Sequence, residues 1–208
     1  MRILHVPTDV GNHGPTLSEA EKALGHKSLS VVFTQSYLGY RADVILGTTR
    51  YRHQFILEIR RWVWLWRALK DYDVIHFNFG TSLAPAPLNK SAGTRGRPWI
   101  RKLYSIYGRF FCQIDLPILK FFGKRIIVTY QGDDARQGWA LRVHYKHSML
   151  DEMEIAGEAG FFDRRLDCLK AERIKRFNKY ADLIYYYNPD LRHVMPDRAK
   201  FLPYPFIF

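Results

Sequence analysis

Gln131 and Asp133 are the side chains best placed to do chemistry in this sequence, because they directly follow a short apolar run. The run, residues 126–130, is rich in β-branched and aromatic residues and too short for a helix, which predicts a buried strand. The turn continues with Gly132 and Asp134, and the glycine lets the backbone take a positive φ or approach a ligand. Ligands of open α/β sheets bind at the carboxyl ends of strands, so we expect this turn to form one wall of a substrate cleft.

A glycine-containing loop after the first apolar run is the second candidate. Residues 2–6 predict a strand, and the loop behind it carries Gly11, Asn12, His13 and Gly14 before a helical pattern begins. The backbone amides of such a loop and the start of the following helix suit a phosphate group. The loop matches neither G-x-G-x-x-G nor G-x-x-x-x-G-K-[ST], so a plain glycine turn is the alternative.

Two further strand ends contribute polar groups. Residues 73–80 read DVIHFNFG, which predicts a strand with His76 and Asn78 near its carboxyl end and a turn at Gly80. A single histidine among apolar neighbours is either a hydrogen-bonded core residue or a catalytic group, and both interpretations stand here. Asn188 follows a later apolar run.

No spacing typical of a metal site is present, so we expect no metal.

The size and charge of the chain restrict its partners. Its 208 residues, 47% of them hydrophobic, suffice for one globular domain, so we expect residues 1–208 to form a single domain. The formal net charge of +12 favours an anionic partner: nucleic acid, an anionic membrane surface or a phosphate-bearing substrate. No nucleic-acid recognition module is visible, so nucleic acid is the least favoured of these. The two cysteines do not have the spacing typical of a disulfide framework or a zinc site. No signal peptide or membrane-spanning segment is visible either, so we expect a cytoplasmic protein.

Apolar strands alternate with helical patterns along the chain. Strands are expected at residues 2–6, 29–34, 42–46, 73–80, 126–130 and 181–187. Helices are expected at residues 15–25, 50–70, 99–122 with an interruption at Pro117, and 163–180. This alternation predicts an α/β fold with a doubly wound, mostly parallel, Rossmann-like sheet.

The helix expected at residues 50–70 combines tryptophans with arginines. Its apolar residues at helical spacing along one face are Phe55, Ile59, Trp62, Trp66 and Leu69. Such a stripe usually packs on the sheet, and the alternative is insertion into an anionic membrane surface. The basic loop at residues 81–101, with Lys90, Arg95, Arg97 and Arg101, suits an anionic acceptor or is solvated surface.

Taken together, these segments resemble the amino-terminal domain of family 4 glycosyltransferases, whose GT-B architecture consists of two facing Rossmann-like domains. The matching segments read MRILHV with the loop at 11–14, SEAEKALGHKS, DVIHFNFG, LPILKFFGKRIIVTYQGDD, ADLIYYYNPDL and FLPYP. They occur in the expected order over nearly the whole chain, and this order is more specific than any single segment.

The resemblance implies an acceptor-binding half of a glycosyltransferase, with a nucleotide diphosphate sugar as donor substrate and no cofactor. The family holds that donor through an E-x7-E glutamate pair in a carboxyl-terminal domain. No two glutamates here have this spacing, so we expect the donor domain in cis beyond this sequence or in trans as a separate chain. By resemblance, the catalytic residues are Gln131, Asp133 and His76. The substrate-binding residues are Gly11, Asn12, His13, Gly14, Asn78, Gly80, Gly132, Asp134 and Asn188.

Two positions depart from the family pattern. Many members carry histidine where this sequence has Gln131, and a glutamine exchanges hydrogen bonds but cannot carry a proton-transfer role. Asn78 likewise replaces a second histidine. Transfer that depends on positioning and on stabilising the departing diphosphate needs neither histidine.

Two classes of function are therefore expected. In the first, the intact protein transfers a hexose from a nucleotide sugar to a glycan, lipid-linked or small-molecule acceptor. In the second, the chain is a stand-alone, non-catalytic domain that recruits a partner protein or binds a glycan or an anionic membrane. The presence or absence of an accompanying donor domain distinguishes the two classes of function.

Overall fold

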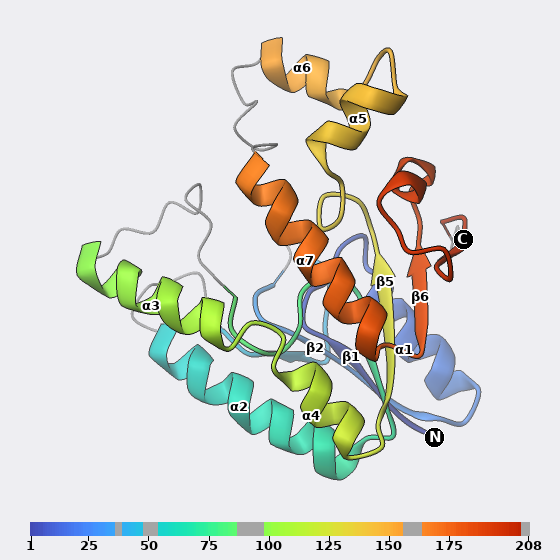
Figure 1. The fold of residues 1–208 in the computed structure, drawn as a ribbon. Helices are drawn as coiled ribbons and strands as arrows, with labels where there is room; N and C mark the ends of the chain where they lie inside the picture. Colours follow the sequence, from blue (N-terminus) through green and yellow to red (C-terminus); the bar gives the residue numbers. More distant parts are fainter. Residues whose placement is uncertain (36–38, 48–53, 87–97, 156–163, 205–208) are drawn as a thin grey trace.

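The computed structural model describes residues 1–35, 39–47, 54–86, 98–155 and 164–204 (Figure 1). Within them the centre of the fold is a seven-stranded sheet with the order β3-β2-β1-β4-β5-β6-β7, in which every pair of neighbours is parallel. The strands are β1 Arg2–Val6, β2 Lys27–Val32, β3 Val44–Ile45, β4 Val74–Phe77, β5 Arg125–Tyr130, β6 Leu183–Tyr186 and β7 Lys200–Phe201. The predicted α/β fold with a doubly wound, Rossmann-like sheet is confirmed.

The strand order creates a switch point between β1 and β4. From β1 the chain moves outward to β3 and then returns to place β4 on the other side of β1. Right-handed connections therefore put helix α1 (His13–Ala23) on one face of the sheet. Helices α2 (Gln54–Asp71), α4 (Asp115–Phe121) and α7 (Arg164–Tyr180) cover the opposite face (Figure 1). Loops after β1 and β4 leave the same edge in opposite directions, which is where ligands of such sheets bind.

The remaining helical elements lie outside these two layers. They are α3 Pro98–Phe110, α5 Gly138–His144, α6 Met149–Ile155 and the 3-10 helix η3 Pro189–His193. The central strands are buried on both faces, which explains their continuous apolar runs: Leu4, Ile75, Ile126 and Val128 are fully buried.

The predicted packing face of α2 is wrong. Leu57, Trp64, Leu65 and Ala68 are buried, whereas Ile59 and Trp66 are 49% and 59% exposed. The side chain of Phe55 lies outside the described residues. The helix carries apolar residues around most of its circumference, so hydrophobic periodicity alone allowed two faces.

Arg61 explains which of the two faces packs inward. Its guanidinium lies 3.7 Å from the ring centroid of Phe33 and donates to the carbonyl oxygens of Leu83 and Ala84, both at 3.2 Å. An arginine with such partners belongs to the covered side of a helix, although a hydropathy pattern counts it as solvent-facing.

The break expected at Pro117 lies earlier in the chain. Helix α3 ends at Phe110, Gln113 takes a left-handed φ of 55°, and α4 begins at Asp115. Pro117 falls in the first turn of α4, where a missing amide hydrogen costs no intrahelical hydrogen bond. Within the basic loop predicted at residues 81–101, Lys90, Arg95 and Arg97 lie outside the described residues, as does the side chain of Arg101.

Candidate functional site

The loop after β1 meets the end of β6 through a stack of aromatic rings. His13, the first residue of α1, stacks on Tyr187 with ring centroids 4.7 Å apart. Tyr187 in turn stacks on Tyr204 at 5.0 Å. The hydroxyl of Tyr204 donates to the backbone oxygen of Gln131 at 3.1 Å. Three segments far apart in sequence therefore converge at one edge of the sheet.

Gly14 packs against the end of β4. A Cβ atom at Gly14 would lie 2.8 Å from Nδ2 of Asn78, so the close approach requires a glycine or a shift of the asparagine. The backbone oxygen of Asn78 accepts a hydrogen bond from Nε2 of Gln131 at 2.6 Å. The loops after β1, β4 and β5 are thus in direct contact, as the rule for carboxyl strand ends predicts.

Asp134 ties the turn after β5 to the turn after β4. Its buried carboxylate accepts hydrogen bonds from the backbone amides of Gly80 at 2.8 Å, Gly132 at 2.8 Å and Gln131 at 3.1 Å. Burial raises the pKa of Asp134 to about 6, and the backbone amides act in the opposite direction. The contacts make Asp134 a positioning group for this edge.

Asp133 points the other way, toward solvent and η3. Its carboxylate pairs with Arg136 at 2.6 Å, and Arg136 also pairs with Asp190 at 2.6 Å. Asn188 donates from Nδ2 to the backbone oxygen of Gln131. Asp133 is the acidic side chain of this turn that a ligand can reach, since 54% of its side chain is exposed.

His76 is a hydrogen-bonded residue of the sheet interior. It is 8% exposed, and its Nε2 lies 2.8 Å from the hydroxyl of Thr129. Its ring lies 5.0 Å from that of His5 in the neighbouring strand. Burial, with smaller contributions from His5 and His13, lowers the pKa of His76 well below its ordinary value. His76 is therefore largely covered from solvent, and its catalytic role stays a prediction.

The buried His76 should make the protein sensitive to acid. Because its folded-state pKa is depressed, its contribution to stability is present above pH 6.5, the ordinary histidine value, and is lost as the pH falls below it. The loss approaches about 1.4 kcal/mol per pH unit. Urea unfolding of wild type and His76→Gln between pH 7.5 and 5 measures it, since glutamine keeps hydrogen-bonding capacity but does not titrate. Parallel pH curves for the two proteins would contradict the assignment.

The sequence patterns placed Asp9 in the loop after the first strand without a role at the site, and gave none to Tyr187 or Tyr204. Among the described residues neither carboxylate oxygen of Asp9 has a hydrogen-bond partner, although both are buried. Burial raises the pKa of Asp9. The backbone amide of Gly14 acts on the carboxylate but is not within hydrogen-bonding geometry, so it lowers this pKa less than burial raises it. The sequence signal was an aspartate in the loop after the first strand, next to the glycines already considered.

The edge presents buried oxygen acceptors that the described part of the protein leaves unsatisfied. Besides both oxygens of Asp9, they are Oδ1 of Asn12 and Oε1 of Gln131. Buried acceptors without donors are rare in folded proteins, because each forfeits its bond to water. Donors from ordered water or from a hydroxyl-bearing ligand would satisfy these oxygens.

Metal-binding clusters and membrane-spanning helices are absent from the part of the chain that the structure describes. The described residues contain no group of three or more histidine, cysteine, aspartate or glutamate side chains able to hold a metal ion. None of the helices among them is long and apolar enough to cross a bilayer.

Similarity of this chain to known proteins is found among solved structures alone. No protein-family model matches it, and a search of curated proteins finds no match. Among solved structures, it is similar to a sucrose-phosphate synthase from Thermosynechococcus elongatus, with a TM-score of 0.45 and 13% identity over 99% of this chain and 89% of that chain.

Proposed function

We propose that this chain is the acceptor-side half of a glycosyltransferase that moves a hexose from a nucleotide diphosphate sugar to a glycan, lipid-linked or small-molecule acceptor. The observation that supports it best is the set of unsatisfied buried oxygens on Asp9, Asn12 and Gln131 at the switch-point edge. Sugar hydroxyls are donors of the kind these oxygens require. The proposed reaction uses no cofactor beyond the nucleotide sugar.

In this proposal the residues divide into two roles. Gln131 and Asp133 orient the sugar and the acceptor, while the loop at 11–14 lies against the donor phosphates. Pro15 has no amide hydrogen, the amide of His13 bonds to the backbone oxygen of Val10, and the amide of Gly14 acts on Asp9. The amides of Gly11 and Asn12 are therefore the donors that this loop offers. The glutamate pair that holds the nucleotide would come from a donor domain in cis or in trans.

Sugar transfer in the presence of the donor half tests the proposal. Nucleotide hexoses are incubated with candidate acceptors and with a protein that contains both halves. Gly14→Glu should abolish transfer, because it places a bulky carboxylate against Asn78 and the phosphate amides. Ala20→Glu, on the exposed side of the same helix, adds the same charge and should retain activity. Full activity in a folded Gly14→Glu variant would refute the assignment.

A second candidate function rests on the exposed face of α3. Trp99, Leu103, Ile106 and Phe110 follow helical spacing and are 57%, 58%, 59% and 79% exposed. The opposite face of α3 is held by α2 through two hydrogen bonds, Tyr104 to Glu58 at 2.6 Å and Trp62 to Tyr107 at 2.9 Å.

We propose that this stripe docks on an anionic membrane surface, which would place the protein at the cytoplasmic face of a membrane. Aromatic and aliphatic side chains of an amphipathic helix enter the boundary of the bilayer, and the net charge of +12 attracts anionic headgroups. Binding of this kind is compatible with transferase activity on a lipid-linked acceptor.

Vesicle sedimentation measures the docking. The double variant Trp99→Ala and Phe110→Ala should bind phosphatidylglycerol vesicles at least about tenfold more weakly, because two large apolar side chains no longer leave water. Leu24→Ala, at the residue after α1 on the opposite face of the sheet and 75% exposed, should bind like wild type. Equal losses in both proteins would exclude α3 as the docking element.

A further inference from the structure

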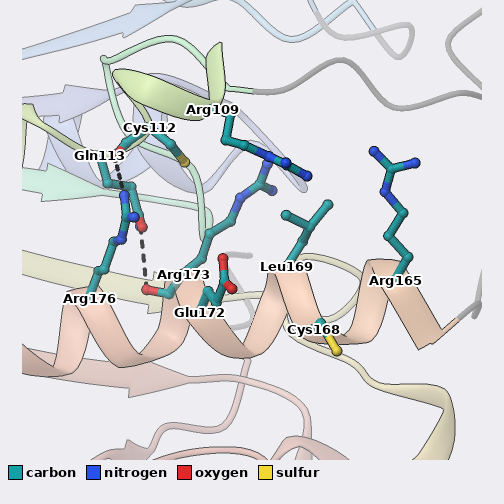
Figure 2. Close-up of a pocket in the computed structure, with 9 residues that line it drawn as sticks. All are labelled: Arg109, Cys112, Gln113, Arg165, Cys168, Leu169, Glu172, Arg173 and Arg176. Atoms are coloured by element: carbon teal, nitrogen blue, oxygen red, sulfur yellow. Dashed lines mark hydrogen bonds between the residues drawn. The ribbon is translucent and has the colours of Figure 1, made fainter. Parts of the chain in front are cut away.

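A basic pocket lies between the carboxyl end of α3 and helix α7, away from the edge formed by Gln131 and the Gly11 loop (Figure 2). Its volume is about 420 Å³. The lining residues are Arg109, Cys112 and Gln113 from the α3–α4 segment, and Arg165, Cys168, Leu169, Glu172, Arg173 and Arg176 from α7. Neither strand ends nor the loops of the candidate site contribute to it.

The helical period of α7 gathers the arginines on one side. Arg165, Leu169, Arg173 and Arg176 recur every three or four residues, which aligns them along one stripe. The buried residues Asp167, Lys170, Ile174 and Phe177 belong to the other side of the same helix. Figure 2 shows Arg109 extending from the end of α3 toward the guanidinium of Arg173.

The charges in this pocket are not balanced. Four arginines line it, and Glu172 is the one carboxylate among the lining residues. Within the described part of the chain, no ion pair includes Arg109, Arg165 or Arg173. Arg176 donates to the backbone oxygen of Cys112, which fixes one wall. Guanidiniums that converge repel one another, and an anion between them replaces this repulsion with attraction.

We propose that this pocket binds a phosphate-bearing anion. The planar guanidinium presents paired donors that match phosphate oxygens, and Arg109, Arg165 and Arg173 have donors free of ion pairs. The volume of about 420 Å³ leaves room for a phosphate-bearing group. The anion is either a small phosphate compound in solution or the phosphate of a lipid headgroup, and the chemistry of recognition is the same for both.

Calorimetric titration with pyrophosphate and sedimentation with phosphatidylglycerol vesicles separate the two sources. The variant Arg165→Gln and Arg173→Gln should weaken pocket binding at least about tenfold, because two charge-assisted hydrogen-bonding groups are lost. The matched control is Arg164→Gln and Lys175→Gln, which removes the same charge from the same helix at residues lining other pockets. It should change the affinity by less than about twofold, because these side chains do not face the anion.

The outcomes are distinct. Pocket-dependent binding of pyrophosphate identifies a small phosphate ligand, and pocket-dependent binding of vesicles alone identifies a lipid headgroup. Equal losses in both variants, or no binding of either probe by wild type, would overturn the proposal. If the double variant unfolds, Arg165→Glu repeats the test, since this exposed side chain lies at the rim of the pocket and in no ion pair of the described residues.

Discussion

Asp134→Ala is expected to lower the free energy of unfolding by at least about 3 kcal/mol. The carboxylate accepts hydrogen bonds from the backbone amides of Gly80, Gln131 and Gly132. Alanine leaves all three without that acceptor, and an unsatisfied buried amide costs about 1–3 kcal/mol. Chemical denaturation monitored by circular dichroism measures the change.

The neighbouring carboxylate provides the control for this experiment. Asp133→Ala removes an ion pair with Arg136 from a side chain that is 54% exposed, so the expected loss is below about 1 kcal/mol. Similar losses for the two variants would show that Asp134 does not hold the turns after β4 and β5 together. The difference between the adjacent aspartates thus reports mainly on the buried carboxylate and its three hydrogen bonds.

Gln131→Ala is expected to reduce kcat/KM for sugar transfer by about a hundredfold or more in a protein that also contains the donor half. The side chain donates to the backbone oxygen of Asn78 at 2.6 Å, and its Oε1 is a buried acceptor without a partner among the described residues. Alanine therefore removes a ligand contact and loosens two loops that align the reactants. A misplacement of about 1 Å is enough for an effect of this size.

Gln137 is a matched control because it is equally buried, with 5% of its surface exposed, as for Gln131. It accepts a hydrogen bond from Nε1 of Trp139 and lies at the start of α5. Gln137→Ala should lower stability without a comparable loss in kcat/KM. If both variants lose activity in proportion to stability, Gln131 has a structural role and no part in transfer.

Much of the fold could be predicted because strands and crossovers leave strong local signals. The apolar run at 126–130 coincides with β5, and residues 2–6 coincide with β1. The inward face of α2 could not be predicted from hydropathy, since Arg61 packs on Phe33 while Trp66 is exposed. The break at Gln113 depends on a left-handed backbone conformation that a proline-based rule does not detect.

The site was predictable to the extent that it follows from topology. Parallel strands bring their carboxyl ends to one edge, and the contacts of Gly14, Asn78 and Gln131 agree with that rule. His76 is buried because β4 is a central strand covered on both faces, so that all four of its residues, VIHF, are buried; the sequence run alone does not show that the strand is central. Tyr204 reaches the edge only through tertiary stacking with Tyr187.

Hydrogen exchange with and without ligand tests the central claim most directly. A protein that contains this chain and its donor half is labelled during turnover with a nucleotide sugar and an acceptor. We predict slower exchange of the backbone amides at residues 9–14, 78–80 and 131–134, because substrates occupy the edge that these loops form. Turnover with unchanged exchange in all three segments would contradict a substrate site at this edge.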